Sequence, residues 1–312
     1  MTLRALLLLA CGLFAGPLAA VPLWSVEHAE SGARVLLLGS VHLLRTEDQP
    51  LPEAVHAAYR QAARVLMELD PAELAPAASA AALGRVGITS PGGSLAESLD
   101  AADWEHARAL AKAADADLEA VAGVEPWFAA IVLYAGFLAQ AGYEPALGVD
   151  PQVADWAARD GKPVAGLETL DEQLLLFKRL TADTQRELFL KTLAELATLP
   201  DDTGALVAEW RAGDIAALAG RLETEFGDFP ELRAALVTRR NRAWLPAVEA
   251  LLSAGETGLV VVGALHLVGP EGLPALLEQA GYRVTLVVAG EGLRSGSSRS
   301  LPCPHRNPGN AS

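Results

Sequence analysis

Two histidines occur in the same short pattern near opposite ends of the chain. The aliphatic runs Val35–Leu38 and Leu259–Val262 are each followed by Gly-x-x-His, which places His42 and His266 at equivalent positions. A continuous aliphatic run bounded by glycine is typical of a strand buried on both faces, so each histidine is expected just beyond a strand end. Imidazole nitrogens at such a point would bind a divalent transition metal. The alternative is that each histidine only caps its strand through backbone hydrogen bonds.

A carboxylate is a candidate for the same site. Glu68 interrupts the apolar run Val65–Leu69, and a buried carboxylate needs a partner because an unpaired charge is costly in a low-dielectric core. Together with His42 and His266, Glu68 would supply nitrogen and oxygen ligands for a metal that keeps an open position. Such a metal would polarise a carbonyl group and lower the pKa of a bound water molecule. Glu68 would otherwise act as the general base, or form a structural ion pair with an arginine.

Three further side chains are candidates for catalysis. Glu168 follows a short predicted strand at 163–167 and would enter the same cleft, unless it is an acid in the first turn of a helix. Arg240 would clamp a substrate carboxylate or stabilise an oxyanion, although its arginine neighbours also suit a solvent-exposed basic face. Asn241 is a mediocre helix former within a predicted helix, which indicates a hydrogen-bonding role. We therefore expect Arg240 and Asn241 to orient the substrate.

The elements that must position these residues repeat as well. A predicted helix at 51–63 and a strand at 65–69 follow the first motif, and a predicted helix at 271–280 and a strand at 284–288 follow the second. Both halves therefore have the order strand, Gly-x-x-His, helix, strand of a βαβ unit, which indicates an internal duplication. Two such units, related by a pseudo-two-fold axis, would bring the two histidines together.

The predicted fold is α/β (α+β), with a central sheet formed by the duplicated units. Residues 21–294 make up the predicted domain, in which 21–70 and 255–290 are the core and 71–254 are a mainly helical insertion. We expect the insertion to form a cap over the mouth of the sheet, since caps of this kind usually select substrate and exclude water. A peptide or other small substrate would lie in the cleft beneath the cap.

The two ends of the chain differ from this domain in composition. Residues 1–20 combine Arg4, an apolar run and small residues up to Ala20, a pattern typical of a signal peptide that predicts a periplasmic or secreted protein. A lipoprotein box ending at Cys11 is the alternative, but the apolar region before it would be very short. Residues 295–312 contain almost nothing apolar and are expected to form a disordered tail.

Composition narrows the classes of function. The chain has 312 residues, of which 51% are hydrophobic, so it is long enough to bury a sizeable core. Its formal net charge of −15 argues against nucleic acid and anionic membrane surfaces as partners. An apolar helix predicted at 126–141 is too short to cross a bilayer, so no integral membrane span is expected. The sequence also lacks a Gly-x-Ser-x-Gly elbow, an HExxH motif and a Walker loop.

The chain resembles the TraB/PrgY/GumN family, which includes the Tiki proteins, and within it looks similar to the GumN-type bacterial branch. Besides the two Gly-x-x-His motifs, the resemblance rests on "VLMELD" around Glu68, "GVD" ending at Asp150, "GLET" containing Glu168, and "RRNRAW" containing Arg240. It implies a two-Gly-x-x-His metal-dependent hydrolase fold, with metallopeptidase activity attributed to the Tiki members. Asp150 also precedes Pro151 and would simply cap the helix that starts there.

The leading hypothesis is an exported, metal-dependent hydrolase that cleaves a peptide or amide bond. His42, His266 and Glu68 would hold a divalent ion such as Mn, Co or Zn, and Arg240 with Asn241 would orient the substrate. Two alternatives stay open. One is a non-catalytic module that sequesters a peptide in the cap cleft. The other is a metal-free esterase, which a distant similarity to erythromycin esterase implies, with a histidine that activates water directly.

Overall fold

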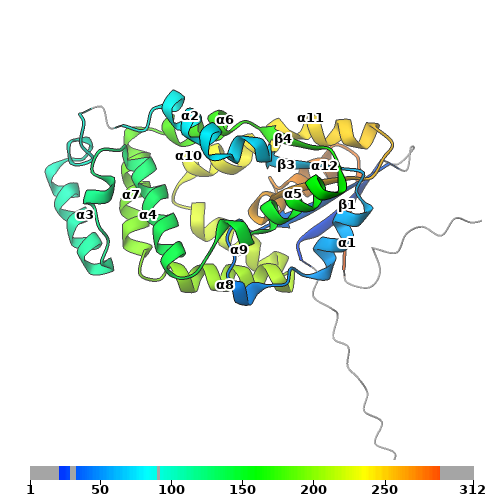
Figure 1. The fold of residues 1–312 in the computed structure, drawn as a ribbon, viewed down its shortest axis with the longest axis horizontal. Coiled ribbons are helices and arrows are strands. Elements are labelled where there is room, and N and C mark those ends of the chain that lie inside the picture. The colour runs from blue at the N-terminus through cyan, green and yellow to red at the C-terminus, as the bar shows by residue number, and fades with distance from the viewer. Residues whose placement is uncertain (1–20, 29–32, 90–91, 289–312) are drawn as a thin grey trace, which may run out of the picture.

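The computed structural model describes residues 21–28, 33–89 and 92–288, which form a mixed sheet with helices around it (Figure 1). The described part holds six strands in the order β4-β3-β5-β2-β1-β6. Their bounds are Leu23–Glu27 (β1), Arg34–Ser40 (β2), Arg64–Leu69 (β3), Val164–Glu168 (β4), Gly258–Gly263 (β5) and Arg283–Leu286 (β6). The predicted signal peptide and the predicted tail lie outside the described residues.

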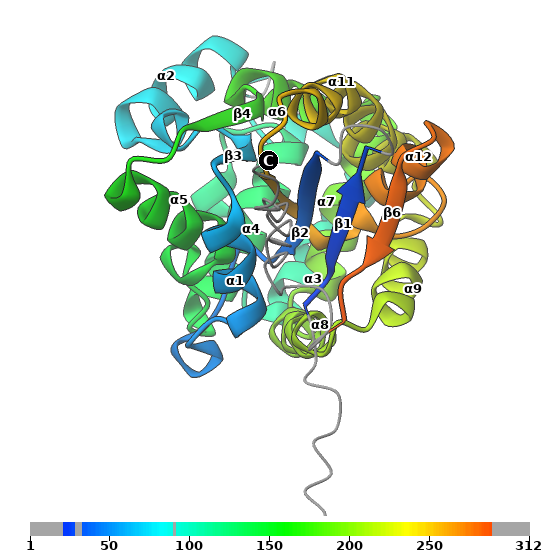
Figure 2. The same ribbon diagram turned by 90° about the vertical axis from the view of Figure 1, so that its right-hand side faces the viewer.

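The sheet places the two aliphatic runs side by side. β2 and β5 are parallel neighbours, with Leu36 opposite Leu259 and Leu38 opposite Val261. All four residues are fully buried, because helices cover both faces of the sheet (Figure 2). A strand covered on both faces shows continuous hydrophobicity instead of alternation. The prediction of two buried strands that end in the repeated motif is therefore confirmed.

Every described strand except β1 runs in one direction. β2, β5, β3 and β4 pair in parallel, and β6 shares their direction because both β2 and β6 are antiparallel to β1. The carboxyl ends of β2, β3, β4 and β5 therefore meet at one edge of the sheet. That edge is where sheets of this type place their ligands.

The two strand–helix–strand units that follow from β2 and β5 interlock across the sheet. From β2 the chain passes through α1 (Glu53–Gln61) to β3 and so crosses β5. From β5 it passes through the 3₁₀ turn η7 (Ala264–Leu267) and α12 (Leu273–Gln279) to β6, in the opposite direction across β2 and β1. Because parallel crossovers are right-handed, opposite directions put α1 and α12 on opposite faces of the sheet, as Figure 2 shows. The α/β class predicted from the sequence is confirmed.

The segment between the two units is mainly helical, but it also contributes β4, which pairs with β3 at one edge of the sheet. Its helices are α2 (Pro76–Val86), α3 (Ala101–Ala114), α4 (Pro126–Gln140), α5 (Val149–Asp160), α6 (Leu170–Lys178), α7 (Ala182–Glu195), α8 (Leu199–Ala212), α9 (Ile215–Phe226), α10 (Pro230–Arg233) and α11 (Arg239–Ser253). Residues of α5 and α11 belong to the core around the sheet. α3, α4 and α7 share a second core that includes Leu133 and Phe189, and Figure 1 shows these helices beyond the sheet.

No helix in the described ranges is long and apolar enough to cross a membrane. The most apolar of the described helices is α4, which has 15 residues and buries Trp127, Leu133 and Leu138 inside the protein. Its hydrophobic surface thus serves the packing of the helical segment.

Candidate active site

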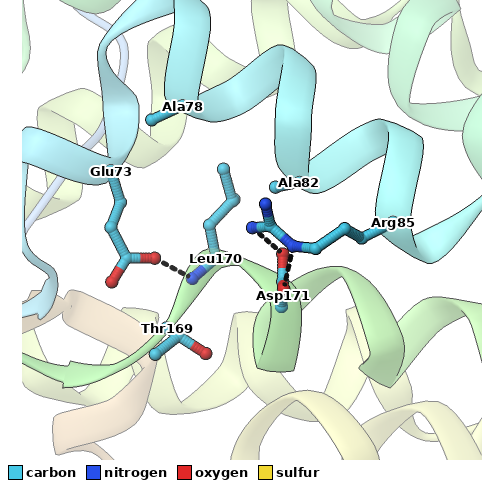
Figure 3. Close-up of a pocket in the computed structure, with 7 residues that line it drawn as sticks. All are labelled: Glu73, Ala78, Ala82, Arg85, Thr169, Leu170 and Asp171. Atoms are coloured by element: carbon cyan, nitrogen blue, oxygen red, sulfur yellow. Dashed lines mark hydrogen bonds and ion pairs between the residues drawn. The ribbon is translucent and has the colours of Figure 1, made fainter.

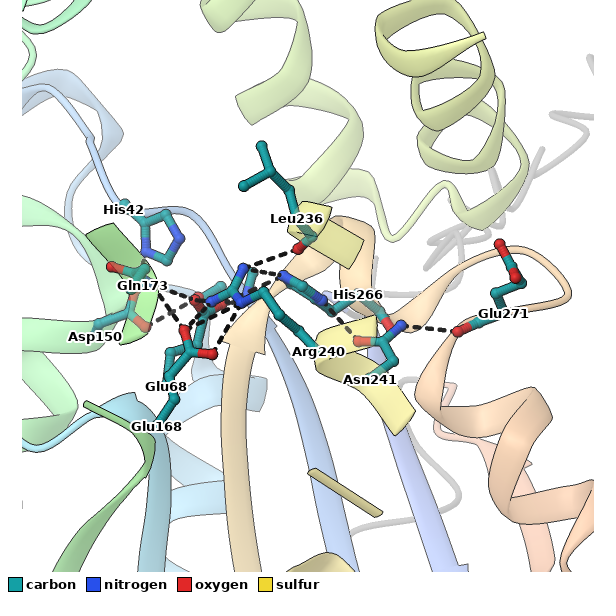
Figure 4. A network of polar contacts seen from close by, with 12 residues as sticks. His42, Glu68, Asp150, Glu168, Gln173, Leu236, Arg240, Asn241, His266 and Glu271 are labelled. Atoms are coloured by element: carbon teal, nitrogen blue, oxygen red, sulfur yellow. Dashed lines mark hydrogen bonds and ion pairs between the residues drawn. The ribbon is translucent and has the colours of Figure 1, made fainter. Parts of the chain in front are cut away.

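The residues predicted for the site meet at the carboxyl edge of the sheet (Figure 4). Glu68 lies near the end of β3, and Glu168 is the last residue of β4. His42 follows β2, while His266 lies in η7 directly after β5. Arg240 reaches the same point from the first turn of α11. Strands that end at one edge thus bring together side chains that are distant in the sequence.

The guanidinium group of Arg240 stands at the centre of the cluster. Its Nη2 atom lies 2.5 Å from Glu68 Oε2 and 2.6 Å from Glu168 Oε1, and its Nη1 atom lies 3.0 Å from His266 Nε2. The residue is only 8% exposed, and the ring of Trp244 lies 4.6 Å from the guanidinium carbon. The alternative of a solvent-exposed basic face is wrong for Arg240, because carboxylates and an aromatic ring take the place of water around it.

A local distortion of the helix accompanies this position of Arg240. α10 continues into α11 through a π-helical turn, η6 (Ala234–Thr238). Nη1 of Arg240 donates a hydrogen bond to the carbonyl oxygen of Leu236 within that turn, at 3.0 Å. A single π turn shifts the register of the residues that follow it, and such turns are frequent at functional sites.

Glu68 is held in its ionised form. One carboxylate oxygen accepts from Arg240, and the other accepts from the backbone N–H of Gly263 at 2.7 Å. Burial by itself would raise the pKa of Glu68, but the positive charge of Arg240 and the Gly263 hydrogen bond outweigh it and lower the pKa to about 2. The buried ion pair considered for Glu68 is therefore present, and its partner is Arg240.

Glu168 faces the same arginine in a less favourable setting. Both of its oxygens accept from Nε of Arg240, at 3.0 and 3.1 Å, and Gln173 donates to Oε1 at 3.1 Å. Burial raises the pKa of Glu168 in spite of these contacts. The alternative of a first-turn helix acid is wrong, because Glu168 ends β4 and Thr169 then caps α6 in a capping box with Glu172.

His266 is buried and electrically neutral. Its Nδ1 atom lies 2.7 Å from Oδ1 of Asn241, while the amide nitrogen of Asn241 donates to the carbonyl oxygens of His266 and Glu271. Since the amide oxygen only accepts, Nδ1 of His266 must carry the proton, and Nε2 is left with a lone pair that accepts from Arg240. Burial lowers the pKa of His266 to about 3. The hydrogen-bonding role expected for Asn241 is met by its contact with His266.

His42 lies on the open side of the cluster, with 59% of its side chain exposed. Its Nδ1 atom lies 3.0 Å from Oδ2 of Asp150, and the charge of this carboxylate is the main reason that the pKa of His42 is raised, to about 9. The other carboxylate oxygen of Asp150 accepts from the hydroxyl group of Ser40 at 3.1 Å. Neither histidine therefore acts as a backbone cap of its strand, since side chains hold both Nδ1 atoms.

Asp150 is the residue of the site that sequence reasoning undervalued. The helix α5 begins at Val149 with Gly148 as its N-cap, so Asp150 lies within the first turn and does not cap the helix. Gly148 is needed there because a Cβ atom would lie 2.3 Å from the carbonyl oxygen of His42. This close approach aims the first turn of α5 at His42. The available signal was the "GVD" triplet that ends at Asp150.

The two motif glycines serve different purposes. A Cβ atom on Gly39 would lie 3.0 Å from Cβ of Pro22 and 3.1 Å from Cα of Ala264, so this glycine allows close packing. A Cβ atom on Gly263 would lie 3.4 Å from both Oε1 of Glu68 and Nε2 of His42. The second glycine therefore leaves a small space that a carboxylate and an imidazole border.

The donor atoms of His42, His266 and Glu68 are of types that bind divalent metal ions. Each imidazole has Nδ1 held by an oxygen of another side chain, which is how metal-binding histidines are usually fixed. Nε2 of His42 borders the space above Gly263, and Nε2 of His266 lies 3.9 Å from Oε1 of Glu68. Within the described ranges, no three His, Cys, Asp or Glu side chains are arranged to hold an ion as they stand, and Arg240 contacts two of the three donors.

A separate surface hollow lies beside the start of α6 (Figure 3). It has a volume of about 300 Å³ and lies between α2 and α6. Its polar groups pair with one another: Glu73 accepts from the backbone N–H of Leu170 at 2.6 Å, and Arg85 forms two hydrogen bonds with Asp171. These contacts hold α2 and the turn before it against the start of α6. None of them involves a residue of the cluster around Arg240.

Among known proteins, one family has a model that matches the part of the chain containing this site. Neither the curated proteins nor the solved structures gave a match. The model of the TraB/PrgY/gumN family matches residues 22–286, which include both Gly-x-x-His motifs and every residue of the cluster. A match over most of the chain, with all of these side chains gathered at one edge of the sheet, means that the chain belongs to the TraB/PrgY/gumN family.

Proposed function

We propose that this protein is a metal-dependent hydrolase that cleaves peptide or amide bonds, with His42, His266 and Glu68 as the residues that would hold a divalent ion such as Mn, Co or Zn. The observation that carries the proposal is the matched orientation of the two imidazoles, each fixed at Nδ1 by another side chain. A bound divalent ion supplies a Lewis acid that polarises the scissile carbonyl and lowers the pKa of a water molecule.

The side chains of the cluster have distinct tasks in this proposal. Arg240 carries a fixed positive charge that is shared by Glu68 and Glu168, and it would stabilise the negative charge that develops on the carbonyl oxygen. Glu168 has a raised pKa because of burial, which suits it to hold a proton at its carboxyl group and pass it to a leaving amine. Gln173 steadies that carboxyl group through its hydrogen bond.

Differences in exposure indicate where a substrate would enter. The side chain of His42 is 59% exposed, whereas those of Glu68 and Arg240 are each 9% exposed. A substrate would therefore approach past His42 and meet the buried charges behind it. Nε2 of His266 has a single lone pair, which now accepts from Nη1 of Arg240, so this hydrogen bond would have to break before a metal could bind there.

One observation favours a second candidate, ester hydrolysis without a metal. Arg240 already places a positive charge between Glu68, Glu168 and His266, so the polarising role of a cation is partly filled by the chain itself. In that case His42 would activate the attacking water directly once it is deprotonated, above its pKa of about 9. Activity that survives a strong chelator would favour this second candidate over the first.

The first experiment is to measure the metal content of protein purified without a metal-chelating tag. Wild type should hold about one divalent ion per chain once Arg240 moves off the donor atoms of His266 and Glu68, because two imidazoles and a carboxylate are ligands that such ions take. His42→Ala and His266→Ala should lose the ion, and His56→Ala is the matched control because His56 stacks on Trp156 away from the site. Retention of the ion in either motif variant would refute the proposed ligands.

A sharper variant uses the space above Gly263. In Gly263→Ala the new methyl group would meet Glu68 and His42 at 3.4 Å, an ordinary contact distance. The backbone at this position is also one that alanine adopts, with φ of −50° and ψ of 137°. We expect a folded protein that loses metal and peptide turnover. Full turnover by Gly263→Ala would show that the reaction takes place elsewhere.

We also propose that the protein is exported, on the composition of residues 1–20. Its negative formal charge of −15 supports a partner other than nucleic acid. The test is to fractionate the producing cells and to sequence the amino terminus of the mature protein. A start at Val21 in a periplasmic or secreted fraction is the expected result, and an uncleaved chain in the cytoplasm would refute it.

A further inference from the structure

The two motif histidines gain the same orientation from unrelated partners. Asp150 of α5 holds Nδ1 of His42, and Asn241 of α11 holds Nδ1 of His266. Both partners come from the segment between the duplicated units, although the histidines come from the units themselves. The two Gly-x-x-His motifs thus supply the imidazoles, and the segment between them supplies a different acceptor for each.

Both acceptors dictate the same tautomer. An ionised carboxylate has no proton to donate, so Nδ1 of His42 must donate to Asp150. The amide nitrogen of Asn241 is committed to two carbonyl oxygens, so its oxygen faces Nδ1 of His266 and accepts from it. The hydrogen bond at one ring nitrogen determines the state of the other. Nε2 of each neutral ring is then free of a proton, and in His266 its lone pair accepts from Arg240.

We infer that Asp150 and Asn241 are a matched pair of positioning residues, which fix the Nδ1–H tautomer of His42 and His266. They thereby place Nε2 of His42 beside the space above Gly263 and Nε2 of His266 3.9 Å from Oε1 of Glu68. Ser40 assists by donating to the second oxygen of Asp150, which limits rotation of that carboxylate. The pair is asymmetric in charge, since one partner is an acid and the other an amide.

The direct test is nitrogen NMR of the histidine side chains. The couplings between the ring nitrogens and the carbon-bound ring protons identify which nitrogen carries the proton. In wild type near pH 10, above the pKa of about 9 that Asp150 gives His42, both motif histidines should show Nδ1–H. In Asp150→Ala, His42 should change to Nε2–H or a mixture, while His266 stays as it was. Asp150→Asn should restore Nδ1–H, because an amide oxygen still accepts.

The matched control is Asp155→Ala, since Asp155 is an exposed residue of the same helix and should leave both rings unchanged. Circular dichroism checks that each variant is folded. An Nδ1–H signal from His42 that persists in folded Asp150→Ala would overturn the inference for Asp150. A wild-type His266 with its proton on Nε2 would overturn it for Asn241.

A second measurement, zinc affinity, rests on the proposed function, whereas the tautomer measurement does not. If the site binds zinc, the affinity measured by calorimetry should fall about 10- to 100-fold in Asp150→Ala, the usual effect of removing a partner that orients a metal ligand. Asp150→Asn should recover part of that loss. Unchanged zinc affinity in Asp150→Ala would overturn the inference. If wild type binds no zinc, the proposed metal site fails, and the tautomer result alone decides the positioning role.

Discussion

Replacement of Arg240 by methionine is the perturbation that the structure predicts most sharply. Methionine keeps the apolar stem of the side chain but removes the guanidinium group that pairs with Glu68 and Glu168. All three side chains are 10% exposed or less, so water cannot replace the lost partner. Removal of one member of a buried ion pair costs about 3–5 kcal/mol, because it leaves an uncompensated buried charge. We expect Arg240→Met to lower the free energy of unfolding by that amount near pH 7.

The difference in stability between wild type and Arg240→Met should depend on pH. The pKa of Glu68 is lowered from 4.5 to about 2 in the folded protein, so the stability it contributes is present above 4.5 and is lost as the pH falls toward 2. Without Arg240, burial dominates and should raise the pKa of Glu68 above 4.5. The folded variant would then take up a proton before the unfolded chain does. Its stability should rise on acidification, and the gap to wild type should narrow.

The assay is urea unfolding followed by tryptophan fluorescence near pH 7 and near pH 4. Arg242→Met is the matched control, because Arg242 lies on the same helix with 65% of its side chain exposed and pairs loosely with Glu271 at 3.6 Å. An exposed pair of this kind contributes about 0–1 kcal/mol. A loss below about 1 kcal/mol in Arg240→Met, or a gap to wild type that widens at low pH, would refute the account of a buried cluster.

Three further predictions address single contacts. Asp150→Asn should lower the pKa of His42 from about 9 toward 6.5, because the carboxylate charge is the main cause of the shift; NMR titration of the His42 ring protons measures it, and an unchanged pKa would contradict it. Gly39→Ala should destabilise the fold by about 1–3 kcal/mol through overpacking, whereas Gly263→Ala should change stability by less; urea unfolding compares the two, and equal losses would contradict the distinction. Trp210→Phe should cost about 1–3 kcal/mol, because it leaves the buried carbonyl of Gly39 without its donor; wild-type stability would show that the bond contributes nothing.

Much of the framework followed from local patterns. The aliphatic runs before His42 and His266 predicted two buried strands, and the repeat of Gly-x-x-His predicted that they belong together. β2 and β5 are indeed parallel neighbours. The acid in Val65–Leu69 was recognised because a carboxylate inside an apolar strand requires a partner. These features are visible in the sequence because each depends on residue type and on a period of a few positions.

The partners within the site depended on long-range packing. Arg239, Arg240 and Arg242 have similar local surroundings in the sequence, and only the resemblance to the family singled out Arg240. In the structure Arg240 is buried against Glu68 and Glu168 where a π-helical turn leads into α11. Asp150 was equally ambiguous beside Pro151, until the approach of Gly148 to His42 aimed the first turn of α5 at the imidazole.

The sequence by itself determined which residues lie at strand ends, since hydrophobic periodicity and glycine placement are local properties of the chain. Only the tertiary structure decided the order of the strands and the choice of ion-pair partner. β5 enters between β2 and β3, and β4 joins from the insertion, so that four carboxyl ends meet at one edge. Such pairings depend on the distances between groups in the folded chain and on the burial of both partners. Spacing along the sequence gives neither of these quantities.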